Sequence, residues 1–174
     1  IPYYRRFLDR FPTVETLARA PLGEVLKLWE NLGYYARVRN LHKAAGVIVA
    51  RFKGRLPDQP EEIIGLPGIG AYTAGAILSI AFGRAVPAVD GNVRRVISRL
   101  WAVEEPIDDE AVRVRIEGVA GSLVPARNPG RFNQALMELG AVCCTPRAPA
   151  CTACPRCGEC RAQAQGIARR LPVR

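Results

Sequence analysis

The chain has 174 residues, which is enough for one domain or for two small lobes with a buried core. Hydrophobic residues make up 49% of it, yet no run of about 18 apolar residues occurs, so we expect no membrane-spanning segment. Twenty-five Lys and Arg against sixteen Asp and Glu leave a formal charge of +9, which favours a nucleic-acid partner and a merely solvated basic surface about equally.

Apolar residues recur three and four positions apart through most of the chain, as at Val47, Ile48 and Phe52. Sustained strand-like alternation is absent, so the pattern predicts an all-α protein of about eight to ten short helices. Helix starts are indicated where Pro, Thr, Asp or Asn precedes an apolar run, at Pro12-Thr13, Pro21-Leu22, Pro57-Asp58, Pro106-Ile107-Asp108 and Asn128-Pro129. Because every cysteine lies in the last third, we predict two lobes that meet near Arg84, residues 1–84 and residues 85–174.

The stretch "LWENLGYYARVRNLHKAA", residues 28–45, interleaves aromatic and basic side chains around a glycine at position 33. One interpretation places its apolar residues in a core and its charges in solvent. The other lets an aromatic residue at the Gly33 turn wedge into a base stack while cations such as Arg37 and Arg39 lie along phosphates. His42, the only histidine, is expected to pack at the surface or to contact a phosphate rather than to act in catalysis.

Residues 61–83, "EEIIGLPGIGAYTAGAILSIAFG", predict a short helix, a glycine-rich turn and a longer apolar helix. Gly68 and Gly70 allow the backbone to turn tightly, and the amides that open the next helix form an anion site. The pattern favours a helix-hairpin-helix turn, Leu66-Pro67-Gly68-Ile69-Gly70, that grips a DNA phosphate without reading sequence. An ordinary connection between two helices is the alternative.

Asp90 begins another predicted helix, in the stretch "PAVDGNVRRVISRL" of residues 87–100. An aspartate at the start of a helix usually serves only as its N-cap, because the carboxylate accepts hydrogen bonds from the first free amides. Taken alone, this position therefore predicts a helix start and no chemistry.

All six cysteines lie within "CCTPRAPACTACPRCGEC", residues 143–160. Disulfides confined to so short a run would constrain little of the chain, and zinc favours two close pairs separated by a longer spacer, which is absent here. The third interpretation takes Cys144, Cys151, Cys154 and Cys160, spaced C-x6-C-x2-C-x5-C, as four thiolates on a cubane iron–sulfur cluster. Cys143 and Cys157 fall outside this spacing and are expected to be a small buried residue and a loop thiol.

The whole chain resembles the catalytic module of the MutY family of adenine glycosylases, within the endonuclease III superfamily. The motifs that carry the resemblance are, in family order, "IPYYRRF", "FPTVETLA", "LGYYARVRNLHKAA", "LPGIGAYTAGAILS", "VDGNVRRV" and "RFNQALMELGAVCCTPRAPAC". The spacing of the four cysteines resembles the superfamily's cluster loop. The resemblance implies a two-lobed helix-hairpin-helix DNA glycosylase fold, with a six-helix module bearing the hairpin and a second lobe that holds a 4Fe-4S cluster as cofactor.

The resemblance also implies a role in base-excision repair. The reaction would be hydrolysis of the N-glycosidic bond of adenine mispaired with 8-oxoguanine or guanine in double-stranded DNA, by a monomeric, cytoplasmic and nucleoid-associated enzyme. Asp90 would face the deoxyribose and stabilise the positive charge that develops on the sugar, and Asn92 would help to position sugar and water. Strand-cutting relatives carry at position 72 a lysine that forms a Schiff base with the sugar. Tyr72 offers no amine, so the resemblance implies a monofunctional enzyme with Tyr72 in the base pocket.

The same resemblance assigns the DNA contacts and the metal ligands. Tyr34 would be the wedge that enters the base stack, with Arg37 and Arg39 beside it on the phosphates. The hairpin would contact the DNA backbone through Leu66, Gly68, Ile69 and Gly70. The metal ligands would be Cys144, Cys151, Cys154 and Cys160.

Two parts of the family's machinery are not among these 174 residues. They are a general-acid glutamate upstream of "IPYY" and a following domain that reads 8-oxoguanine. General acid catalysis supplies about 10²- to 10⁴-fold in rate, so we expect this chain alone to bind DNA but to release adenine poorly or not at all. Two alternatives stay open: a thymine-mismatch glycosylase, in which tyrosine also occurs at the Tyr72 position, and a non-catalytic helix-hairpin-helix DNA-binding module with zinc.

Overall fold

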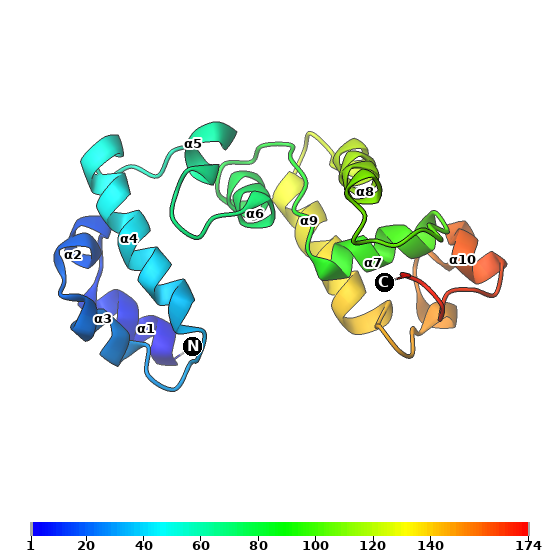
Figure 1. Ribbon diagram of the computed structural model, residues 1–174, viewed down its shortest axis with the longest axis horizontal. Helices are drawn as coiled ribbons and strands as arrows, with labels where there is room; N and C mark the ends of the chain where they lie inside the picture. The colour runs from blue at the N-terminus through cyan, green and yellow to red at the C-terminus, as the bar shows by residue number, and fades with distance from the viewer. Residues whose placement is uncertain (1, 174) are drawn as a thin grey trace. The chain divides into compact units, whose positions relative to one another are not determined.

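The computed structural model describes residues 2–173, and these residues form α-helices joined by short loops (Figure 1). The α-helices are α1 (Pro2–Arg10), α2 (Val14–Arg19), α3 (Leu22–Leu28), α4 (Tyr35–Phe52), α5 (Pro60–Ile64), α6 (Ala71–Ala81), α7 (Gly91–Leu100), α8 (Glu110–Leu123), α9 (Pro129–Glu138) and α10 (Arg161–Ala164). Three shorter helical turns of other types are η1 (Leu139–Cys143), η2 (Cys151–Ala153) and η3 (Cys157–Glu159). The predicted all-α class is confirmed, since the described residues contribute only an isolated β-bridge between Pro106 and Val173. None of these helices is both long and apolar enough to cross a bilayer.

The described residues divide into two compact units, the first ending at Gly70 and the second beginning at Ala71. The boundary predicted near Arg84 rested on where the cysteines lie, whereas the contacts group α6 with the second unit because this helix packs along α9. The predicted division into a hairpin module of residues 1–84 and a cluster lobe of residues 85–174 stays a prediction.

The first unit is built on α4, against which α2 and α3 pack. Thr13 caps α2, and its side chain and that of Thr16 each accept from the other's backbone amide, as the predicted helix start required. The ring nitrogen Nε2 of His42 lies 2.9 Å from the carbonyl oxygen of Ala20, so the only histidine ties α4 to the end of α2. The buried core comprises Phe11, Leu17, Ala20, Val25, Val38 and Ala45.

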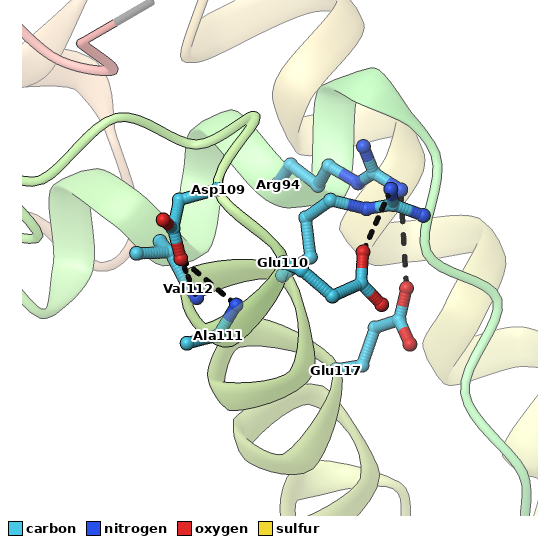
Figure 2. A network of polar contacts seen from close by, with 7 residues as sticks. Arg94, Asp109, Glu110, Ala111, Val112 and Glu117 are labelled. Carbon is cyan, nitrogen blue, oxygen red and sulfur yellow. Dashed lines mark hydrogen bonds and ion pairs between the residues drawn. The ribbon is translucent and has the colours of Figure 1, made fainter.

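The second unit is built on α7, which contacts α8, α9, α10 and η1. Figure 2 shows how α8 begins: the carboxylate of Asp109 accepts hydrogen bonds from the amides of Ala111 and Val112, at 2.8 and 3.2 Å. The predicted start at Asp108 is therefore one residue early. Arg94 and Glu117 add an ion pair of 3.8 Å between α7 and α8. The buried core between these helices comprises Val89, Val93, Ile97, Val103, Ile107, Val112, Ile116 and Ala120.

A buried asparagine of α9 fixes the extended segment that leads from α6 to α7. Asn133 is 1% exposed and donates from Nδ2 to Ser79 Oγ and to the Val86 carbonyl, both at 2.9 Å. Its Oδ1 accepts from the Ala88 amide at 3.3 Å. On the other side a Cβ at Gly75 would lie 2.0 Å from the Pro87 carbonyl oxygen, so only glycine lets α6 approach this closely. These contacts determine where the segment places Asp90, the N-cap of α7.

Candidate functional site

The residue delivered to the start of α7 is Asp90, and both of its carboxylate oxygens are held. Oδ1 accepts from the Val93 amide at 2.8 Å, which is the N-cap contact expected from the sequence. Oδ2 accepts from the side-chain amide of Asn92 at 3.0 Å. The residue is only half-buried, so a carboxylate of fixed orientation remains accessible from outside the unit. Helix capping and a chemical role are therefore compatible in this residue.

Arg95 fixes the orientation of Asn92, a role that was not predicted from the sequence. Arg95 is 8% exposed, and its guanidinium donates from Nη2 to Asn92 Oδ1 at 2.8 Å and to the Gly140 carbonyl at 2.6 Å. Its Nε donates to the Cys144 carbonyl at 2.7 Å. Because Oδ1 of Asn92 faces the guanidinium, Nδ2 has to face Asp90. A continuous hydrogen-bonded path thus joins the carboxylate to the backbone of the cysteine loop.

Tyr72 lies in the first turn of α6, in the same unit as Asp90. Its hydroxyl contacts the sulfur of Met137 on α9 at 3.6 Å, and 43% of the residue is exposed. Met137 packs against the core cluster that contains Val89, the neighbour of Asp90. Within residues 2–173, Tyr72 and Asp90 belong to the same unit and are not joined by a hydrogen bond.

The six cysteines are brought together in space as well as in sequence. All are half-buried free thiols, and all line one cavity together with apolar side chains of α7 and η1 such as Val96 and Leu139. Burial, and after it the charges of Cys144 and Cys160, raises the pKa of Cys151, while nearby Arg99 acts in the opposite direction. Within residues 2–173 no three His, Cys, Asp or Glu side chains converge closely enough to hold one metal ion.

Arg99 is the second functional residue that the sequence did not single out. It is 1% exposed, and its guanidinium donates to four carbonyls: Leu171 at 2.9 Å, Cys144 at 3.2 Å, Thr145 at 2.7 Å and Pro146 at 2.9 Å. Its Nη1 also lies 3.2 Å from the Cys144 sulfur. No carboxylate forms an ion pair with it among the described residues. A buried cation without a carboxylate favours an anionic occupant beside it.

In the first unit, the turn before α4 displays an aromatic side chain. Asn31, Gly33 and Tyr34 all have left-handed backbones, with φ of 68°, 69° and 50°. The indole of Trp29 donates to the Gly33 carbonyl at 2.9 Å and holds the turn. Tyr34 is 75% exposed, and the guanidinium of Arg37 lies over its ring at 4.7 Å. A strained backbone that presents an exposed ring is typical of a binding site rather than of a core.

The predicted hairpin turn, residues 66–70, forms the end of the first unit. Gly68 has φ of 78°, and a Cβ there would lie 2.6 Å from Cβ of Asn40, so this position requires glycine. Gly70 is outside the left-handed region and has open space around it, and the sequence did not distinguish the two. Leu66 is 3% exposed and anchors the turn, and its carbonyl accepts from the Ile69 amide at 3.1 Å. The exposed parts of the turn are Gly68 and Gly70; Arg39 on α4 is exposed as well.

Known proteins match the chain both in sequence and in fold. A family model described as HhH-GPD superfamily base excision DNA repair protein matches residues 1–120. The chain is 40% identical, over all of its residues, to an adenine DNA glycosylase of Buchnera aphidicola subsp. Acyrthosiphon pisum (strain APS), and covers 50% of that protein. It is 46% identical to a human adenine DNA glycosylase over 94% of its residues, and covers 30% of that protein. It therefore spans half or less of the length of these relatives.

Solved structures give the same assignment. A thermostable thymine-DNA glycosylase superposes with a TM-score of 0.84 at 29% identity, covering 94% of this chain and 76% of that one. An endonuclease III trapped as a covalent intermediate with DNA superposes with a TM-score of 0.79 at 26% identity, covering 95% of this chain and 76% of that one. The predicted fold and family are confirmed: the chain belongs to the HhH-GPD superfamily of base excision DNA repair proteins and is a homologue of the adenine DNA glycosylases.

Proposed function

We propose that this chain is the catalytic module of an adenine DNA glycosylase that hydrolyses the N-glycosidic bond of adenine opposite 8-oxoguanine or guanine. The observation that carries the proposal is the carboxylate of Asp90, which is fixed by Val93 and Asn92 yet remains accessible. Breaking the bond between sugar and base builds positive charge on the sugar, and a pre-oriented carboxylate stabilises that charge without having to reorganise. Water then completes the hydrolysis at the sugar carbon, and the base leaves with a proton.

The side chain at position 72 supports a reaction that leaves the DNA strand uncut. Cleavage through a Schiff base requires a primary amine at the sugar, and Tyr72 has none. Its ring, partly exposed beside Met137, instead offers a flat surface for the flipped base. The expected product is an intact strand with an abasic site, which strand-scission gels with and without alkali distinguish from a nick.

DNA binding is proposed on charge and on two exposed turns. The hairpin would approach a phosphate through backbone amides, and Tyr34 would fill the space left by the flipped adenine, with Arg37 and Arg39 near the phosphates. Contacts to six or more phosphates would lower affinity by about 10³-fold between 50 and 200 mM salt. Titrating the chain with a mismatched duplex at salt concentrations over that range tests the proposed phosphate contacts. An affinity that does not change with salt would contradict them.

We propose a 4Fe-4S cluster as the cofactor, held by Cys144, Cys151, Cys154 and Cys160. Two features of residues 2–173 support it: all four thiols line one cavity, and the buried Arg99 guanidinium, which forms no ion pair with a carboxylate there, lies 3.2 Å from the Cys144 sulfur. When bound, such a cluster supplies anionic charge and four metal–thiolate bonds that cross-link the loop. A colourless protein with one zinc and no iron would overturn the assignment.

A thymine-mismatch glycosylase is the second candidate, favoured by the superposition on a thymine-DNA glycosylase. Single-turnover assays on adenine opposite 8-oxoguanine and on thymine opposite guanine decide between the two. They should be run on the 174-residue chain and on the longest polypeptide that its gene encodes. The assay of adenine release by the 174-residue chain also tests the expectation that this chain alone releases adenine poorly. Release of thymine without release of adenine by the longer polypeptide would replace the primary proposal.

A further inference from the structure

One face of α9 and of the following turn η1 contacts the chain segments that carry Tyr72, Asp90 and Asn92. This face, which we call the α9 face, consists of Asn133, Met137 and Gly140. The three residues are spaced four and three positions apart, so they lie along one side of the helix. The contacts of Asn133 with the segment before Asp90 are already described, and α9 packs against both α6 and α7. The other two residues extend this support to the site itself.

Gly140 leaves no space for a side chain on the side that faces Asn92. A Cβ at position 140 would lie 2.6 Å from Cβ of Asn92 and 3.0 Å from its carbonyl oxygen, well inside the distance at which such atoms pack. The Gly140 carbonyl also accepts from Nη2 of Arg95, the same nitrogen that donates to Oδ1 of Asn92. The backbone at Gly140 is therefore packed against Asn92 and shares with it the donor that orients its amide.

The helix changes its hydrogen bonding at this point. The amide of Cys144 donates to the Leu139 carbonyl at 2.7 Å, five residues back, which is the bond of a π-turn. Gly140 is the buried residue of this turn. Single π-turns are frequent at functional sites in proteins, and this one lies where the helix meets Asn92.

Met137 supports Tyr72 from the same face. Its sulfur accepts from the Tyr72 hydroxyl at 3.6 Å, and Met137 packs against the buried core of the second unit. Tyr72 itself is partly exposed, so the thioether is the anchored partner of the pair. A long, flexible thioether side chain follows the shape of its surroundings and makes a favourable contact with an aromatic residue.

We infer that Met137 and Gly140 are positioning residues of the proposed reaction. Met137 acts through Tyr72, and Gly140 acts through Asn92, which in turn holds Asp90. Because both lie on the α9 face, the register of one helix sets the tyrosine of the base pocket and the amide beside the carboxylate together. The inference rests on the proposed function for the roles of Tyr72 and Asp90.

The first test measures single-turnover adenine release and affinity for a mismatched duplex, in the longest polypeptide that the gene encodes. Gly140→Ala should lower the rate by about 10- to 100-fold, as expected for Asn92→Ala, and change the affinity by less than about threefold. Adding Gly140→Ala to Asn92→Ala should cause no further loss, because both changes act on the same amide. Gly118→Ala is the matched control and should keep the full rate, since this exposed glycine of α8 has open space around it.

The second test uses Met137→Leu, which keeps an apolar side chain of similar size and removes the sulfur that accepts from Tyr72. The rate should fall by about three- to tenfold, the effect of one lost hydrogen bond. Combined with Gly140→Ala the two losses should multiply, because they act on different side chains. Leu136→Met makes the reverse exchange at the neighbouring core position and should keep the full rate. Since Met137→Leu conserves volume, it tests the α9 face even if Gly140→Ala does not fold.

Crystal structures of the variants give a readout that does not depend on turnover. In Gly140→Ala the side-chain amide of Asn92 should have turned away from Oδ2 of Asp90, and in Met137→Leu the ring of Tyr72 should have moved. Full rates in both variants, side chains that have not moved, or a multiplied loss when Gly140→Ala is added to Asn92→Ala would overturn the inference. If the unsubstituted polypeptide releases neither adenine nor thymine, the proposed function fails, and the positions of Asn92 and Tyr72 still decide whether the α9 face holds them.

Discussion

The side-chain amide of Asn92 donates to Oδ2 of Asp90 at 3.0 Å. The other end of the same amide accepts from buried Arg95, so Asn92 cannot flip without breaking both contacts. Replacing Asn92 with alanine should leave Oδ2 of Asp90 without its donor, while Oδ1 still accepts from the Val93 amide. We expect single-turnover adenine release to fall by about 10- to 100-fold while DNA affinity changes little. Asp90→Asn is the reference and should lower the rate of adenine release further. A full rate in Asn92→Ala would show that the hydrogen bond to Oδ2 of Asp90 is not needed for catalysis.

Arg99 should be necessary for metal retention. Arg99→Met removes the donor from the carbonyls of Leu171, Thr145 and Pro146 and from the Cys144 sulfur in a buried site, and leaves the Cys144 carbonyl with Arg95 alone, a loss of about 3 kcal/mol or more. Iron per chain and the melting temperature should both drop. Arg113→Met is the control, because its ion pair with Glu110, at 3.1 Å, is exposed and contributes at most about 0.5 kcal/mol. Equal effects of the two substitutions would contradict a special role for Arg99.

The hairpin allows a test with two glycines two residues apart. Gly68→Ala combines a left-handed backbone with a contact of 2.6 Å to Asn40, so it should destabilise the first unit by about 1–3 kcal/mol and weaken DNA binding. Gly70→Ala meets open space and should be nearly neutral in stability. Thermal unfolding and duplex affinity of both variants check this. If Gly70→Ala alone weakened binding, a close approach of DNA backbone at that residue would be the reason.

Tyr34 should matter for DNA and not for folding. It is 75% exposed and holds a left-handed backbone, so Tyr34→Ala removes almost no packing. Loss of one ring stacked on bases costs about 1–3 kcal/mol, which predicts about 5- to 150-fold weaker binding to a mismatched duplex. Tyr4→Ala, at a tyrosine that is 68% exposed on α1, is the control and should retain affinity. Fluorescence anisotropy of a labelled duplex measures both, and matching losses would remove Tyr34 from the interface.

The surface ion pair between Glu105 and Arg115 predicts that the stability of the protein depends on pH. The hydrogen bond from Arg115, at 2.8 Å, lowers the pKa of Glu105 from 4.5 to about 2. Because the folded-state pKa is the lower one, the pair stabilises the protein above the ordinary pKa of Glu105, and this contribution is lost as the pH falls from there towards 2. Glu105→Gln should therefore lower the melting temperature at neutral pH and make no difference near pH 2. A constant difference at every pH would exclude this cause.

Much of the fold could be predicted because its signals are local. Apolar spacing defined the helices, and side-chain caps such as Thr13 and Asp90 mark helix starts whose hydrogen-bond partners lie three residues away. The left-handed backbone at Gly68 likewise follows from a turn within five residues. Family resemblance then assigned roles that local physics left open, above all for Asp90, which by itself predicted only a cap.

Arg95, Arg99 and Asn133 were missed because their partners are distant in the sequence. Arg99 reaches a carbonyl 72 residues away, and Arg95 one that is 49 residues away. Arginine is almost always exposed, so composition gives no reason to expect either in the interior. One signal was available: Arg95 and Arg99 are four residues apart and lie on one face of α7, the face that also carries apolar residues. A helix with two cations on its buried face requires acceptors, and the irregular cysteine loop supplies the carbonyls of Cys144, Thr145 and Pro146.

The carbonyl of Cys144 accepts from both Arg95 and Arg99, at 2.7 and 3.2 Å. The loop consequently cannot detach without leaving two buried guanidinium groups short of acceptors at once, and α7 cannot unwind without releasing the loop. Local opening of the loop and melting of α7 should then be one cooperative event. Native-state hydrogen exchange should report a single opening free energy for the amides of residues 93–100 and those of Cys144 and Ala150, well above that of the exposed turn before α4.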